Sequence, residues 1–143
     1  MEISEVKRRL RDTVERARRT AAERRVRADE ANREYPVFLE TVAVPIFKQT
    51  AAVLKAENYL FTVFTPVGSV RLMSDRNAED FIELTLDTSG PSPLVIGRTS
   101  RARGRRVIES ERAVGIESGA VRDLTEEQVL TFLAEELEPF VER

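Results

Sequence analysis

The feature that most constrains this chain is an uninterrupted stretch at its start. Residues 2–33 contain neither glycine nor proline, the two residues that interrupt helices most strongly. At 100° per residue, its small and apolar side chains fall within one stripe about 100° wide. They are Ile3, Val6, Leu10, Val14, Ala17, Ala21, Ala28 and Ala31. The pattern predicts one long amphipathic helix over residues 1–34.

The charged residues of this segment are ordered as well. Five acid-to-base pairs at i,i+4 have the acid first, which is the favoured orientation: Glu5–Arg9, Asp12–Arg16, Glu15–Arg19, Glu23–Arg27 and Asp29–Arg33. Each pair stabilises an isolated helix by about 0.2–0.5 kcal/mol. Residues 1–34 hold 11 basic and 8 acidic residues, against 12 and 17 in the remaining chain. We interpret the segment as a self-paired, solvated helix rather than a nucleic-acid-binding arm.

The apolar stripe points to a protein partner. At 1.5 Å per residue the helix is about 45 Å long, whereas the body of so small a domain is roughly 25–30 Å across. We expect the overhang to form an oligomer interface, giving a homodimer or another homo-oligomer, through Ile3, Val6, Leu10, Val14, Ala17 and Ala21. Because Arg24 interrupts the stripe and the spacing departs from a strict heptad, the body or an antiparallel helix is favoured over a long parallel coiled coil.

The rest of the chain predicts a sheet between two more helices. A second helix is expected over residues 35–58, with Pro36 in its first turn, a kink at Pro45 and Asn58 as its left-handed cap. From Tyr59 the apolar period changes to two, and turn residues divide residues 59–114 into five strands. A capping box at Thr125 opens a C-terminal helix within residues 123–142. Short connections favour an antiparallel meander with helices on one face, in a single α+β domain over residues 1–143.

Composition argues against several kinds of chemistry. The chain has no cysteine and no histidine, so disulfides, thiolate chemistry, the commonest general base and the commonest metal-binding nitrogen are missing. Asp87 and the oxygen-rich run at residues 75–80 are interpreted as turns, since Asp80 and Leu86 replace the glycine and glutamate that a calcium loop needs. We expect no catalytic residue, metal or cofactor, and an enzyme based on carboxylates and arginine ranks last.

Five arginines surround a predicted hairpin turn at Gly104. They are Arg98, Arg101, Arg103, Arg105 and Arg106. Two interpretations stay open for them. They could pair across strands with Glu83, Asp87, Glu109 and Glu111, or they could bind phosphate or a nucleic-acid backbone. No aromatic side chain lies among these arginines, so the segment has no ring on which a nucleic-acid base could stack. We favour the structural or interfacial role.

The remaining expectations concern location and function. The start of the chain lacks a secretory segment and no run approaches 18 apolar residues, so we expect a cytoplasmic protein without a membrane partner. Arginine outnumbers lysine 20 to 3, which indicates GC-rich coding and suggests a bacterial source. The sequence therefore predicts a non-enzymatic, self-associating interaction or scaffold domain.

Overall fold

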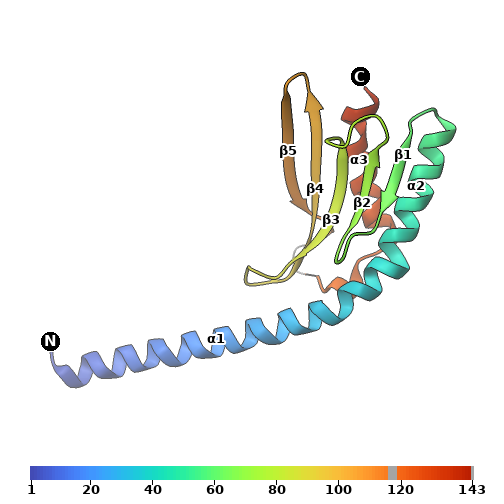
Figure 1. The fold of residues 1–143 in the computed structure, drawn as a ribbon. Coiled ribbons are helices and arrows are strands. Elements are labelled where there is room, and N and C mark those ends of the chain that lie inside the picture. Colours follow the sequence, from blue (N-terminus) through green and yellow to red (C-terminus); the bar gives the residue numbers. More distant parts are fainter. Residues whose placement is uncertain (116–118, 143) are drawn as a thin grey trace.

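A computed structural model describes residues 1–115 and 119–142 and has the predicted α+β architecture (Figure 1). Its helices are α1 (Ile3–Phe38), α2 (Val44–Ala56) and α3 (Glu126–Val141). Its strands are β1 (Phe61–Phe64), β2 (Val70–Ser74), β3 (Phe81–Asp87), β4 (Leu94–Arg103) and β5 (Arg106–Ala113). A π-helical segment, Leu39–Ala43, joins α1 to α2, and a 3-10 turn, Val121–Asp123, precedes α3.

The predicted boundary between the first two helices is wrong. Helix α1 continues through Pro36 to Phe38 rather than ending near residue 34. Pro36 and Asn32 are both exposed, so water can bind the Asn32 carbonyl that the proline leaves without its helical donor. The interruption comes instead at the π-helical segment just before Pro45, where the Val44 N–H reaches back five residues to the carbonyl of Leu39. The kink predicted at Pro45 is thus confirmed, while the start of the second helix is corrected.

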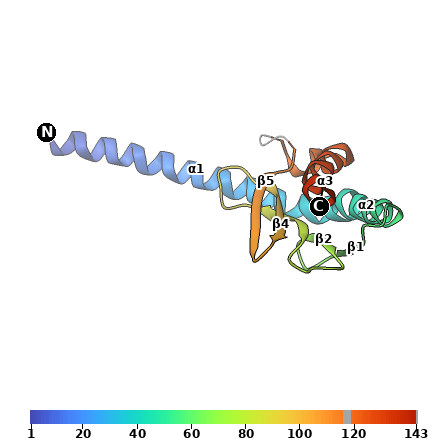
Figure 2. The same cartoon turned by 90° about the horizontal axis from the view of Figure 1, so that it is seen from above.

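The first part of α1 stands away from the rest of the molecule (Figures 1 and 2). Every residue from 1 to 27 is exposed except Glu5, which is half-buried. Within the described residues, the outermost hydrogen bond from α1 to the body is made by Arg27, whose guanidinium donates to the Pro91 carbonyl at 2.9 and 3.2 Å. Only the end of the apolar stripe enters the core, through Ala31, Tyr35 and Phe38. The remainder of the stripe lies on the same helix face, in solvent.

The five strands form an antiparallel meander in the order β1-β2-β3-β4-β5, as predicted. Helices α2 and α3 pack on one face of this sheet (Figure 2), and the core lies between the two layers. Gly97 of β4 is required there, because a Cβ at this position would lie 2.1 Å from the Phe132 ring of α3.

The capping box at Thr125 forms with Gln128 as predicted. Arg112 of β5 further ties α3 to the sheet, with ion pairs of 2.6 Å to Glu135 and 2.7 Å to Glu136.

Tyr35 fixes the end of α1 to the sheet. Its buried hydroxyl donates to the Gly68 carbonyl at 3.0 Å, and the Leu84 carbonyl lies 3.3 Å away. Burial raises the pKa of Tyr35 above its usual value, and the nearby Glu83 carboxylate adds to that effect. The phenol therefore stays protonated at neutral pH and keeps its donor there.

Replacing Tyr35 with phenylalanine should lower the free energy of unfolding by about 1–2 kcal/mol, because the Gly68 carbonyl and the buried Leu84 carbonyl lose the hydroxyl that donates to them. Tyr59→Phe is the matched control, since that hydroxyl lies 3.4 Å from the Val141 carbonyl and is only part-buried; its loss should be smaller. Urea denaturation followed by circular dichroism measures both. Equal losses would show that Tyr35 contributes only as an aromatic side chain.

Candidate functional site

The structure separates the five predicted arginines rather than gathering them. Arg98 lies on the sheet face opposite the helices, paired in register with Glu83 of β3 and Glu111 of β5. Its guanidinium carbon is 5.3 Å from the Phe81 ring centroid, and that of Arg71 is 4.1 Å from the same ring. Arg71 forms a 2.6 Å ion pair with the buried Glu83. The register thus places Arg98 opposite both glutamates, as predicted, but no ion pair of Arg98 is recorded among the described residues and its buried Nε has no hydrogen-bond partner there. Its guanidinium packs beside Phe81 instead.

The remaining arginines lie nearer the hairpin tip. Arg101 is half-buried and projects from the opposite sheet face to Arg98, since side chains alternate along a strand. Arg103 and Arg106 face each other across the last register pair, and Arg105 lies in the turn between them. All three are exposed, and none has a recorded ion pair among the described residues. The candidate anion site thus reduces to the tip of the hairpin.

The charges of α1 are less paired than the sequence predicted. Of the five expected i,i+4 pairs, only Glu5–Arg9 closes to an ion pair in the described structure, at 2.9 Å. Arg16 lies 3.4 Å from the Thr13 hydroxyl instead. Residues 1–27 hold ten basic and five acidic residues, a net charge of +5. The projecting part of the helix is therefore more basic than the count over residues 1–34 indicated.

The predicted interface residues of α1 are all exposed. Among them Ile3 is 74% exposed, Leu10 60% and Val14 44%, and Val6, Ala17 and Ala21 lie on the same face. No hydrogen bond links residues 3–26 to another element of the described chain. Isolated apolar side chains on a surface are ordinary, but an aligned row on a free helix is not. The row remains the best candidate for a contact with another molecule.

An apolar groove between α2 and α3 was missed by sequence reasoning. Its volume is about 330 Å³, and its outer wall includes Val53, 64% exposed, and Leu130, 47% exposed. The other lining residues are Ile46, Gln49, Thr50, Leu54, Leu133, Ala134 and Leu137. One feature of the sequence indicated this groove: α2 has apolar residues on more sides than a single buried face requires.

The acidic residues weighed as catalytic or metal-binding groups take structural roles. Asp80 is buried and accepts the Ala102 N–H at 2.7 Å, and Asn77 accepts the Glu79 N–H in a turn. Hydrogen bonds from the Ser89 hydroxyl and N–H lower the pKa of Asp87. Within the described ranges, no group of three acidic side chains is arranged to hold a metal ion. These positions agree with the turn interpretation.

By length and composition alone, the continuous helix Ile3–Ala56 includes one stretch apolar enough to cross a membrane. This is weak evidence for a membrane span, because the core helix of a soluble protein passes the same test. Part of the apolar surface of this helix packs in the core, through Ala43, Ile46 and Phe47. Only 22% of the stretch is buried, however, so α2 retains apolar surface that its own chain does not cover.

Comparison of the chain with protein-family models, with curated proteins and with solved structures finds no match. The function is therefore argued from the surfaces of this molecule: the apolar stripe of α1, the α2–α3 groove and the hairpin tip.

The network around Phe81 gives a stability prediction. Glu83→Gln should lower the free energy of unfolding by about 1–3 kcal/mol, because it leaves the partly buried guanidinium of Arg71 without its carboxylate. The matched control is Glu135→Gln, whose side chain is 60% exposed beside Arg112; a change within about 0.5 kcal/mol is expected. Urea titrations of the two variants test this, and a neutral Glu83→Gln would show that the network does not stabilise the sheet.

Proposed function

We propose that this chain is a non-enzymatic interaction domain that self-associates through the projecting part of α1. The observation that carries the proposal is a solvent-exposed row on the part of α1 beyond the Arg27 hydrogen bond to the body. The row consists of Ile3, Val6, Leu10 and Val14. This row is continuous with the side chains that enter the core, so the helix presents to a partner the same face that it buries in its own body.

Energetics support a partner for this helix. Isolated helices depend mainly on packing of an amphipathic face, and here that face has no packing partner within the chain. Covering Leu10 and Val14 would contribute about 1 kcal/mol for each side chain, given the area each still exposes. Several such contacts in a symmetric assembly add together, and their surplus over the translational and rotational freedom lost on association sets the affinity.

Sedimentation velocity tests the proposal directly. The wild-type chain should be oligomeric at high micromolar concentration, and Leu10→Ser with Val14→Ser should weaken association by about tenfold to a hundredfold. The control is Val26→Ser, since Val26 is 57% exposed but lies on the opposite face of α1; its oligomeric state should match the wild type. A wild-type chain that remains monomeric at high micromolar concentration refutes the proposal.

A second candidate function is supported by the hairpin tip. Arg103 and Arg106 are a like-charge pair directly opposite each other, an arrangement that destabilises a sheet unless an anion relieves it. Three guanidiniums at one tip suit phosphate oxygens, which accept paired hydrogen bonds from arginine. In this second candidate function, the hairpin tip binds a phosphate-bearing polyanion through charge, without recognising its bases.

Titration with labelled single-stranded DNA and RNA at low and moderate salt tests the tip. Arg103→Ser with Arg106→Ser should remove binding at low salt and leave the stability unchanged. Arg98→Ser serves as control: it should destabilise the sheet without lowering affinity, because Arg98 lies in the network around Phe81. Equal affinities of the wild type and the tip variant exclude this function.

A further inference from the structure

We propose that the α2–α3 groove of one copy receives the projecting part of α1 from a second copy. This inference rests on the proposed self-association and names the surface on which the helix docks. It is carried by three features of the described chain: an unfilled apolar groove, an acidic rim on that groove, and a basic border along the apolar stripe of α1.

The shape and lining of the groove suit the binding of a helix. Two adjacent helices form its walls, and Leu133 and Leu137 of α3 face Ile46 and Leu54 of α2 across it. Helix-in-groove recognition uses apolar anchors at i, i+3, i+4 and i+7 spacing. On α1, Ile3, Val6, Leu10 and Val14 stand at i, i+3, i+7 and i+11, so successive anchors are three or four residues apart and share one face. Both surfaces are exposed in the chain alone, so each lacks cover that the other can provide.

The rim of the groove is acidic on one side and uncharged on the other. Helix α3 carries five glutamates and no basic residue. Glu127 lies one turn before Leu130 and Glu138 one turn after Ala134, so both exposed carboxylates border the groove. Neither has a recorded ion pair among the described residues, whereas Glu135 and Glu136 are engaged by Arg112. The lysines of α2 do not line the groove, and Lys48 lies on the side of the β1–β2 turn.

The apolar stripe of α1 has a basic border. At 100° per residue, Lys7, Arg11, Arg18 and Arg25 form one row directly beside Ile3, Leu10, Val14 and Ala21. All four are exposed, and none has a recorded ion pair within the described residues. When the stripe enters the groove, this row meets the carboxylates of Glu127 and Glu138. Complementary charge thus adds to the apolar contact and fixes its orientation.

The same basic row argues against pairing of α1 with α1. In an antiparallel pair the row of each helix would border its own copy, placing Arg11 of one chain beside Arg18 of the other. A parallel pair could use only the free part of the stripe, because Ala31 and Tyr35 are already buried in the core of their own chain. An acidic surface elsewhere on the second copy suits the basic row better than a second α1 does.

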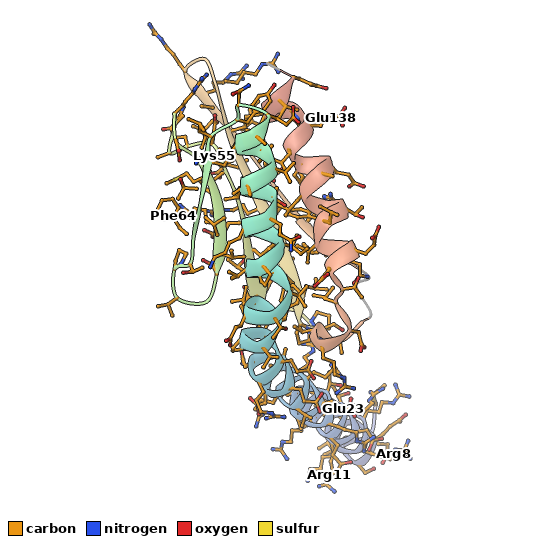
Figure 3. The ribbon with its side chains drawn as sticks, turned by 90° about the vertical axis from the view of Figure 1, so that its right-hand side faces the viewer. Arg8, Arg11, Glu23, Lys55, Phe64 and Glu138 are labelled. Atoms are coloured by element: carbon orange, nitrogen blue, oxygen red, sulfur yellow. The ribbon has the colours of Figure 1, made fainter. Side chains whose placement is uncertain are left out.

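One copy cannot fill its own groove. Helix α1 ends at Phe38, directly before the bend at Leu39–Ala43, and its first part points away from α2 and α3. Figure 3 shows the end that bears Arg8 and Arg11 well away from both helices. The same view shows α2 and α3 side by side, with Glu138 on α3. The occupant of the groove has to come from another molecule.

A charge exchange between two variants tests the inference. Arg11→Glu with Arg18→Glu makes the border of α1 acidic, and Glu127→Arg with Glu138→Arg makes the rim of the groove basic. Each variant alone should associate about tenfold more weakly than the wild type. Mixed in equal amounts, the two should regain wild-type association, because the acidic helix of one fits the basic groove of the other. Sedimentation velocity of the separate and mixed samples, with folding checked by circular dichroism, gives the answer.

Two further variants keep the test interpretable. Glu79→Arg with Glu109→Arg makes the same change of charge away from the groove and should associate like the wild type. Leu130→Gln removes an exposed apolar contact of the groove without a change of charge and should weaken association even if the rim variant fails to fold.

The outcomes separate the two proposals. If Leu10→Ser with Val14→Ser prevents association while the rim variant and Leu130→Gln behave like the wild type, the groove is not the seat and self-association still stands. A monomeric wild type overturns both. A monomer that sediments with anionic phospholipid vesicles also overturns both, because the basic border then serves a lipid surface.

Discussion

The amide of Pro45 has no hydrogen to donate, and that missing bond sets the directions of two helices. Without a normal bond to the Thr41 carbonyl, the backbone widens into the π-helical segment Leu39–Ala43. The bend there allows α2 to lie along the sheet while α1 leaves it. Tyr35 then holds the start of the bend against the carbonyl of Gly68. The groove and the projecting stripe both depend on this bend. Without it, a single helix from Ile3 to Ala56 could not both pack along the sheet and point away from it.

Local patterns predicted much of the fold, because they reflect contacts that are close in sequence. The change of period at Tyr59 located the sheet, and the capping box at Thr125 located α3. The helix boundary at residue 35 failed, because α1 continues through Pro36, where water can bind the exposed Asn32 carbonyl in place of the donor that the proline lacks. The close approach of the Phe132 ring to Gly97 could not be predicted, because it joins a helix and a strand far apart in the sequence.

The candidate surfaces were predictable to different degrees. The position of Arg98 opposite Glu83 followed from strand alternation, a regular geometry that sequence spacing describes well. The ion partner did not follow, because the recorded ion pair of Glu83 in the described structure is with Arg71. The i,i+4 pairs of α1 were overestimated, because exposed arginines gain little by closing an ion pair in water. The α2–α3 groove was missed altogether, since only the tertiary packing of α3 decides which apolar residues of α2 stay uncovered.

The straight projection of α1 also has a mechanical consequence. From Arg27 outward the helix forms a lever arm of about 36 Å, so a tilt of about 10° at its base moves the tip by about 6 Å. Among the described residues, the bond between Arg27 and the Pro91 carbonyl is the outermost hydrogen bond that restrains that tilt. A partner that holds Ile3 and Leu10 therefore senses small rotations at the base of the helix, amplified over its length. The stiffness of the contact between Arg27 and Pro91 thus determines how accurately the N-terminal end of α1 can be positioned.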